Sequence, residues 1–212
     1  SQYLKSMIAI ELVHSYSLIH DDLPCMDDDD YRRGRLSTHK KYDEAQAILA
    51  GNSLLTMGFN LLSQDSNPAL VKLLSLLSGH KGLAGGQSLD IDTIEKKLNY
   101  KIIKKIHEKK TARLFEFCLA APFIISNKSQ REINLSRKYG KIIGIIFQII
   151  DDVHDYENKD NEYINILNVM TKDDALEKCY RYEAEANSLR EKLLPNKKNR
   201  MNDILSFIIN RK

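Results

Sequence analysis

The stretch Ile142-Ile143-Gly144-Ile145-Ile146-Phe147-Gln148-Ile149-Ile150-Asp151-Asp152-Val153-His154-Asp155 decides the fold. Residues 142–150 are apolar on every helical face, which is typical of a helix buried inside a bundle rather than lying on its surface. Because residues i and i+4 share a helix face and i+1 lies beside them, Asp151, Asp152 and Asp155 are predicted to form one acidic ledge. The sequence therefore predicts a buried helix whose acidic end opens into a cavity.

A second acidic cluster lies far upstream, at Asp21-Asp22-Leu23-Pro24-Cys25-Met26-Asp27, followed at once by Asp28, Asp29 and Asp30. It too follows an apolar helical pattern, which Pro24 ends. Carboxylates crowded on one site resist ionising together, so two clusters brought face to face need a cation between them. All-oxygen ligands select hard cations, and Mg²⁺ in particular binds through a few carboxylates plus the oxygens of a substrate phosphate. The two clusters indicate diphosphate chemistry, and a solvated acidic face is the alternative.

The composition favours one globular, all-helical domain. The 212 residues are 42% hydrophobic and 29% charged, with only 9 glycines, 4 prolines and no tryptophan. A net charge of +3, with lysine clusters that contain no interleaved aromatic residues, disfavours nucleic acid as a partner. The 3 cysteines lack paired or metal-type spacing, which predicts a reducing cytoplasm. The longest apolar run is shorter than the ~20 residues that cross a bilayer, so we expect no stable membrane insertion.

Helical periodicity and breaker residues predict the elements of the bundle. A first helix runs up to Asp21-Asp22, a polar loop covers 27–38, and no strand pattern stands out. Pro122 is expected to kink or end the helix in which it lies. The further helices are expected at 42–63, 70–89, 100–108, 114–125, 129–155, 172–194 and 201–209.

With these residues in hand, the chain resembles the short-chain trans-isoprenyl diphosphate synthases, and most closely the bacterial farnesyl diphosphate synthases. The likeness covers nearly the whole chain, and its motifs are specific in their order and spacing. They are His20 to Gly34, Leu49-Ala50-Gly51-Asn52, Gly85-Gly86-Gln87-Ser88-Leu89-Asp90, Lys110-Thr111 and Phe147 to Asp155.

This resemblance implies a homodimeric protein with an all-α, isoprenoid-synthase-type helix bundle and a central active-site cavity. The aspartate clusters would face each other across it and hold three Mg²⁺ ions, for which Mn²⁺ can substitute, on an allylic diphosphate. The implied metal ligands are Asp21, Asp22, Asp27, Asp151, Asp152 and Asp155. Arg32 and Lys110 would grip the allylic diphosphate and Arg33 the diphosphate of isopentenyl diphosphate. The resemblance places Thr111, Gln148, Gln87 and Asp90 around the developing cation.

The chemistry of these side chains suits those roles. Ionising an allylic C–O bond separates charge, so Mg²⁺, lysine and arginine at the leaving group lower the barrier. The catalytic residues expected on this basis are Lys110, Thr111 and Gln148, whose amide dipole could face the cation. Gln148 could instead cap a neighbouring backbone group, and Arg32 and Arg33 could only neutralise Asp28 to Asp30.

Two departures from the family pattern concern diphosphate binding. The Gly-Lys-Arg-x-Arg-Pro stretch that binds isopentenyl diphosphate in the family does not precede Asp21. We therefore expect a single polyprenyl synthase domain over 1–212 that lacks the family's N-terminal helices, and that cannot condense isopentenyl diphosphate in this form. After Asp155, Lys159 is the candidate for the family's diphosphate-binding lysine.

For the full-length protein, the resulting expectation is a Mg²⁺-dependent prenyltransferase that condenses dimethylallyl or geranyl diphosphate with isopentenyl diphosphate to give farnesyl diphosphate. Tyr16 lies five residues before Asp21, roughly 7 to 8 Å along the helix, and would floor the product pocket unless it is a packed core aromatic. The alternatives are a geranylgeranyl diphosphate synthase, a catalytically impaired binding subunit, a terpene cyclase and a Ca²⁺-binding bundle. The cyclase would normally carry an Asn-Ser-Glu type motif, and the Ca²⁺ bundle leaves Arg32-Arg33 and Lys110-Thr111 unexplained.

Overall fold

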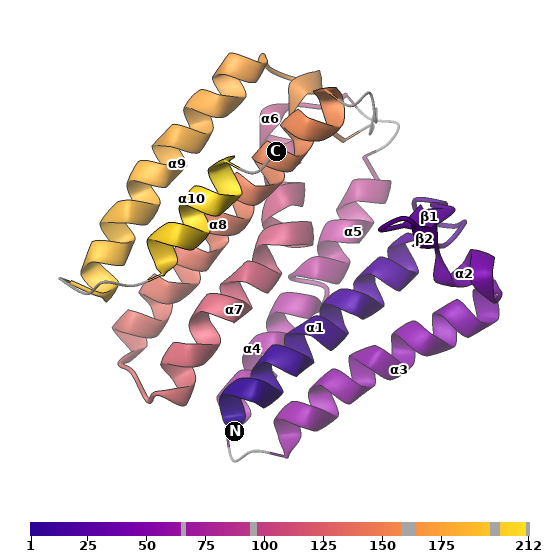
Figure 1. Ribbon diagram of the computed structural model, residues 1–212, viewed down its shortest axis with the longest axis horizontal. Coiled ribbons are helices and arrows are strands. Elements are labelled where there is room, and N and C mark those ends of the chain that lie inside the picture. The colour runs from indigo at the N-terminus through magenta and orange to yellow at the C-terminus, as the bar shows by residue number, and fades with distance from the viewer. Residues whose placement is uncertain (65–66, 94–96, 158–163, 196–199, 211–212) are drawn as a thin grey trace. The chain divides into compact units, whose positions relative to one another are not determined.

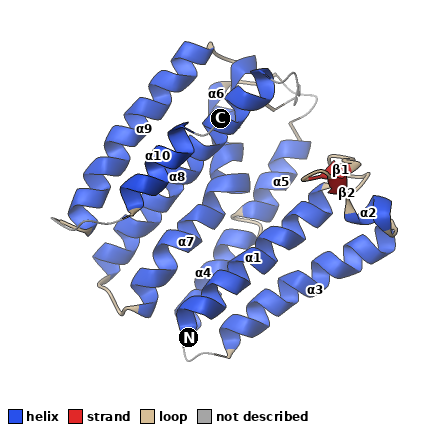
Figure 2. Cartoon of the chain, viewed as in Figure 1, coloured by secondary structure: helices blue, strands red, loops and turns tan. Residues whose placement is uncertain are grey.

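The computed structural model describes the chain except for residues 65–66, 94–96, 158–163, 196–199 and 211–212. The chain divides into two compact units, Ser1–Leu74 and Ser75–Lys212. Helices make up almost all of the described secondary structure (Figure 1, Figure 2), which confirms the all-α prediction. Among the described helices, none combines the length and the apolar character that crossing a bilayer requires.

The first unit is built on α1 (Gln2–Asp21) and α3 (Glu44–Ser63), which pack side by side in opposite directions. Each begins with a side-chain cap, since Ser1 accepts from the backbone N–H of Leu4 and Asp43 from that of Gln46. The antiparallel contact is close: a Cβ on Gly51 would lie 2.1 Å from the Nε2 atom of His20. The two helices thus hold the acidic end of α1 beside the start of α3.

The segment between α1 and α3 contains a small hairpin that the sequence did not predict. Strands β1 (Tyr31–Arg32) and β2 (Arg35–Leu36) pair antiparallel. Arg33 and Gly34 both have positive φ, 53° and 72°, as a type I′ turn requires at its two central positions. The hairpin leads into the short helix α2 (Thr38–Lys41), which was also expected to be loop.

The prediction of one helix over 70–89 is wrong. Two helices occupy this region, α4 (Pro68–Ser78) and α5 (Leu83–Ile91). The chain turns between them, where the N–H of Gly82 donates to the carbonyl of Gly79 at 2.8 Å. A Cβ on Gly82 would lie 1.8 Å from the carbonyl oxygen of Leu77, so the turn needs glycine there.

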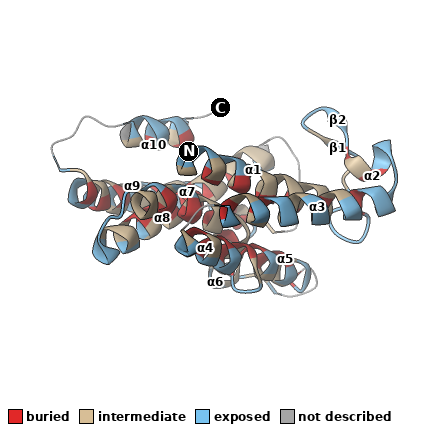
Figure 3. Ribbon diagram, turned by 90° about the horizontal axis from the view of Figure 1, so that it is seen from below, coloured by how far each residue is buried: buried red, intermediate tan, exposed pale blue. Residues whose placement is uncertain are grey.

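The second unit surrounds the long helix α8 (Gln130–Glu157). Its core draws on α6 (Tyr100–Ile106), α7 (Ala112–Ile125), α9 (Lys172–Leu193) and α10 (Met201–Asn210). Buried positions cluster along α7, α8 and α9 (Figure 3). Of the predicted buried stretch 142–150, residues 142–146, 149 and 150 are buried, whereas Phe147 and Gln148 are partly exposed. α7 continues through Pro122 to Ile125, so the proline neither ends the helix at its own position nor interrupts it.

Candidate active site

The first aspartate cluster lies where α1 ends. Asp21 is the last helical residue and Asp22 caps the helix. The chain then folds back, because the N–H of Asp27 donates to the carbonyl of Asp21 at 2.9 Å. This bond brings the backbones of Asp21 and Asp27 together, as two ligands of one metal cluster would require. Asp22 differs from them, since it is only 2% exposed.

Arg32 offsets part of the negative charge of this cluster. Its Nε and Nη2 atoms donate to Oδ1 of Asp22 at 2.8 and 2.5 Å, and Nη2 also donates to Asp29 at 2.8 Å. Burial works to lower the pKa of Arg32, but the hydrogen bond and charge of Asp22 outweigh it and raise that pKa above its usual value. Arg32 therefore remains a cation here, and Nη1 is the nitrogen with which a diphosphate oxygen could bond. The expected partners were Asp28 to Asp30, and of these the arginine contacts Asp29.

Arg33 and Tyr16 also stand near the end of α1. Arg33 is exposed at the hairpin turn. The pKa of His14 is lowered, mainly by burial and also by the positive charges of Arg33 and Arg32, whereas the negative charge of Glu11 acts to raise it.

Tyr16 is partly buried and its ring meets that of His20 edge to face, with centroids 5.4 Å apart. Burial and then the charge of Asp21 raise the pKa of Tyr16, so its hydroxyl stays protonated. Its role as the floor of a product pocket stays a prediction.

In the second unit, the aspartates at the end of α8 do not form one ledge. Asp151 and Asp155 are partly exposed, but Asp152 is 1% exposed. Its Oδ2 accepts the backbone N–H of Ile166 at 2.7 Å and lies 3.2 Å from Nε2 of His107. The prediction that Asp152 lies on the ledge is therefore wrong, because helical spacing cannot show that position 152 turns toward the core. The carboxylate ties α8 to the 3₁₀ turn η2 (Ile166–Asn168) and to a neighbouring helix.

Lys110 and Thr111 lie in a π-helical turn, η1 (His107–Thr111), between α6 and α7. Such single π turns often occur at functional sites, and sequence periodicity did not reveal this one. Lys110 Nζ donates to Oδ2 of Asp90 at 2.6 Å, so these two predicted site residues lie together. The turn approaches α5 so closely that a Cβ on Gly86 would lie 2.4 Å from the backbone nitrogen of Lys110.

A chain of hydrogen bonds joins the remaining predicted residues. The hydroxyl of Thr111 donates to Oε1 of Gln148 at 2.7 Å, and Nε2 of Gln148 donates to Oδ1 of Asp152 at 3.1 Å. Gln148 therefore bonds side chains rather than capping a backbone group, which was the alternative for this residue. Its carbonyl is oriented by Thr111 and its amide by Asp152.

Gln87 on α5 is 8% exposed, and neither its Oε1 nor its Nε2 has a hydrogen-bond partner among the described residues. Leaving a buried amide unpaired costs about 1 to 3 kcal/mol, so such a group is commonly found where a ligand binds. The role of Gln87 in lining a substrate site stays a prediction.

Two residues of this network were missed by sequence reasoning. His107 contacts Asp152, and the Nδ2 of Asn165 donates to the Asp152 carbonyl at 2.7 Å. Nothing in the spacing of these residues marks them, because the contacts form only when η1, α8 and η2 pack together. Lys159, proposed as the family's second diphosphate-binding lysine, lies outside the described residues.

The donor sets fit hard divalent cations. Asp21 with Asp27, and Asp151 with Asp155, present only carboxylate oxygens, which is the ligand type that Mg²⁺ takes in combination with substrate phosphates. Asp22 and Asp152 are each engaged by hydrogen bonds within the protein. For these two residues direct metal binding stays a prediction.

The fold and these side chains place the protein in the isoprenoid-synthase class of all-helical proteins. A crystal structure of geranyltransferase from Helicobacter pylori 26695 superposes with a TM-score of 0.89 and 32% sequence identity. The match covers 99% of this chain and 74% of the geranyltransferase chain. A second structure of the Helicobacter pylori protein, complexed with magnesium and isoprenyl diphosphate, matches 99% of this chain and 73% of its own, with a TM-score of 0.80 and 32% identity.

Sequence comparison identifies the family. The polyprenyl synthetase model matches residues 1–180, and the chain belongs to that family. It is 41% identical over 162 residues to farnesyl diphosphate synthase of Bacillus subtilis (strain 168). The matched residues cover 73% of this chain and 55% of that relative. It is also 41% identical over 162 residues to the large subunit 2 of a heterodimeric geranylgeranyl pyrophosphate synthase of Arabidopsis thaliana, over 73% of this chain and 43% of the relative. The chain thus spans about half the length of the curated relatives it matches.

Proposed function

We propose that the protein is a Mg²⁺-dependent prenyltransferase that condenses dimethylallyl or geranyl diphosphate with isopentenyl diphosphate, with farnesyl diphosphate as product. The observation that carries the proposal is the Lys110–Asp90 and Thr111–Gln148–Asp152 network beside the acidic end of α8. It places a cation, a hydroxyl and an oriented amide within one unit. Membership of the polyprenyl synthetase family supports the same chemistry.

The reaction begins when the allylic C–O bond breaks and its electron pair leaves with the diphosphate. Bound Mg²⁺ would neutralise the charge that builds on the leaving group. Asp21, Asp27, Asp151 and Asp155 would hold the metal, three ions in all, and Mn²⁺ could replace them. Lys110 and Arg32 would hold the diphosphate oxygens, and Lys110 would exchange its contact with Asp90 for one with the substrate.

The carbon skeleton keeps the positive charge and must be protected from water. The carbonyl oxygen of Gln148 and the hydroxyl oxygen of Thr111 present negative dipole ends without being strong nucleophiles. The amide of Gln87 is available for the same purpose. The new bond then forms between the cationic carbon and the alkene of isopentenyl diphosphate, whose diphosphate Arg33 would hold. The resulting cation loses a proton from the adjacent carbon to an oxygen of the released diphosphate, and a new double bond forms.

The test is product formation by the full-length protein from radiolabelled isopentenyl diphosphate and each allylic diphosphate. We expect a fifteen-carbon diphosphate with Mg²⁺ and no turnover after chelation by EDTA. Lys110→Ala should lower kcat by about 10²-fold, since it removes a donor that matters most as the diphosphate departs, whereas the exposed Lys172→Ala control should not. Turnover that persists without a divalent cation would overturn the proposal.

A geranylgeranyl diphosphate synthase is the second candidate, and the match to the Arabidopsis thaliana large subunit favours it. The same assay separates the two, because a twenty-carbon product from the unchanged protein supports this candidate. A catalytically impaired binding subunit would give no product with any starter.

We also propose that the protein acts in the cytoplasm as a homodimer. Support for the compartment comes from Cys25, Cys118 and Cys179, none of which forms a disulfide bond within the described part of the chain. Support for the dimer comes from the family resemblance. Light scattering of the purified protein should give twice the mass of the chain, and a monomer would contradict this part of the proposal.

A further inference from the structure

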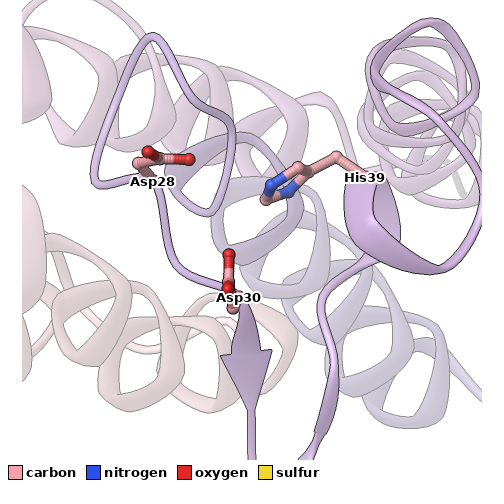
Figure 4. Close-up of side chains that lie close together, drawn as sticks. All are labelled: Asp28, Asp30 and His39. Atoms are coloured by element: carbon pink, nitrogen blue, oxygen red, sulfur yellow. The ribbon is translucent and has the colours of Figure 1, made fainter.

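We propose that Asp28, Asp30 and His39 form a binding site for a divalent cation of the zinc class, distinct from the Mg²⁺ ligands. The three residues come from the segment that follows Asp27, and the inference does not depend on the proposed function. Each offers one ligand atom, and these atoms lie within 4.8 Å of one another. Figure 4 shows the two carboxylates and the imidazole ring pointing toward a common centre.

The hairpin explains why these residues meet. Its strands β1 and β2 return the chain to its starting point, and the N–H of Ser37 donates to the carbonyl of Asp30 at 2.9 Å. His39 follows within the first turn of α2, so its ring extends back toward Asp30. On the other side, the N–H of Asp28 donates to the carbonyl of Leu23 at 3.1 Å, which holds Asp28 against the end of α1.

His39 points to a ligand independently of the acidic residues. The side chain is buried, with 7% exposed, yet its Nε2 has no hydrogen-bond partner among the described residues. Nδ1 lies 3.1 Å from the hydroxyl of Ser37, which is itself buried. When Nδ1 carries the proton and donates it to Ser37, Nε2 presents a lone pair, which is the tautomer that binds metal. Histidine ligands commonly have such a second partner, which fixes the ring orientation.

The ligand types select the kind of cation. Imidazole nitrogen suits zinc and its neighbours in the first transition row, whereas Mg²⁺ prefers oxygen ligands alone. Three protein ligands and one open position are typical of a tetrahedral zinc site. With zinc–ligand bonds of about 2.0 to 2.2 Å, two ligand atoms of such a site lie about 3.3 to 3.5 Å from each other. Asp28 and Asp30 are exposed, so their carboxylates can move inward by the remaining distance of about 1 Å.

Lys40 supplies the positive charge when no metal is bound. Its Nζ lies 2.8 Å from Oδ1 of Asp30 at the surface, which leaves Oδ2 of that carboxylate for the ion. The bound ion would join Asp28, Asp30 and α2 and so fix the segment that carries Arg32 and Arg33. The site would therefore act as a clamp on this loop.

The test is a Zn²⁺ titration of the full-length protein in excess Mg²⁺, followed with a competing fluorescent zinc indicator. Excess Mg²⁺ competes for the proposed all-oxygen sites, so one Zn²⁺ per chain should bind more tightly than any other, and the ¹⁵N resonance of His39 Nε2 should shift on binding. His39→Asn, Asp28→Asn and Asp30→Asn should each weaken Zn²⁺ binding by at least about tenfold. The matched controls are the exposed His80→Asn and Asp173→Asn, which should bind as the wild type does.

Equal Zn²⁺ affinity in wild type, His39→Asn and Asp28→Asn would overturn the proposal, and so would the absence of Zn²⁺ binding in excess Mg²⁺. Circular dichroism checks that each variant is folded. If His39→Asn does not fold, Asp28→Asn decides alone, because its side chain is exposed and asparagine tolerates the positive φ of 54° at this position.

Discussion

The two aspartate clusters contain the same residue type, but the chain holds them in different ways. The first lies at the end of α1 and in the loop that follows, where Asp21 and Asp27 are joined by one backbone hydrogen bond and the side chain of Arg32 forms a salt bridge with Asp22. The second lies on a long buried helix, where Asp152 is fixed by a backbone N–H and by His107. An arginine side chain can change its rotamer when a ligand arrives, whereas a backbone N–H held by the fold cannot. We infer that the first cluster adjusts to the metal diphosphate and the second is organised beforehand.

The largest effects are expected at the two clusters themselves. Asp21→Ala and Asp151→Ala should each lower kcat by about 10³-fold, because in the proposed mechanism each removes an oxygen ligand from an ion that stabilises the departing diphosphate. Both residues are partly exposed, so the thermal unfolding temperature should change little. Steady-state kinetics with geranyl diphosphate measures the effect. A variant with near wild-type turnover would remove its cluster from the mechanism.

The next effect separates a structural aspartate from its neighbours. Asp152→Ala should destabilise the protein by about 3 kcal/mol, since it leaves the buried N–H of Ile166 and the ring of His107 without their acceptor. For a chain of this size that loss lowers the unfolding temperature by roughly 6 to 12 °C. Asp155→Ala, on the partly exposed side, should cost no more than about 1 kcal/mol. Differential scanning calorimetry compares them, and equal losses would contradict the assignment of Asp152.

A change in product rather than in rate is expected at Tyr16 on α1. Removing the ring in Tyr16→Ala should extend the apolar path toward Leu12 and Ile8, which precede it on the same helix. The product should shift from fifteen carbons to twenty or more. Chromatography of radiolabelled products decides this, with Tyr16→Phe as the control that keeps the ring. A fifteen-carbon product from Tyr16→Ala would place the floor elsewhere.

The smallest effect concerns thiol reactivity in the two regions. Cys25 is exposed in the loop of the first cluster, whereas burial and then the charge of Glu183 raise the pKa of Cys179 to about 12. At pH 8 a chromogenic disulfide reagent should therefore react quickly with Cys25 and with Cys179 only after unfolding. The raised pKa also stabilises the fold below about pH 9, and this contribution is lost as the pH rises toward 12. Mass spectrometry of the labelled peptides identifies the reacting thiol, and rapid labelling of Cys179 would contradict its burial.

Sequence reasoning worked best where one physical signal dominates. The apolar run before Asp151 predicted the buried helix α8, and Pro24 placed the end of the first helix. It failed where neighbouring elements decide the outcome. The break at Gly82 depends on a steric contact with Leu77, and the π turn at 107–111 follows a helical pattern that does not distinguish it.

The site was predictable in its composition and only partly in its contacts. Lys110, Thr111 and Gln148 were named from motifs, and the structure brings Thr111 and Gln148 into a direct hydrogen bond. The inward orientation of Asp152 was not predictable, because residues i and i+1 on a helix are about 100° apart and spacing alone does not show which one faces the core. His107 and His39 carry no motif at all, and their roles follow from burial and from the partners that packing supplies.

The proposed function requires that both clusters act on one metal diphosphate, and a double-mutant cycle tests this requirement most directly. The affinity of a non-hydrolysable allylic diphosphate analogue would be measured by calorimetry in Mg²⁺ for wild type, Asp21→Asn, Asp151→Asn and the double variant. Residues that act as a unit are strongly non-additive, so the double variant should bind little worse than the weaker single variant. Losses that add in free energy would contradict the account, because they would show that each cluster acts on the ligand independently.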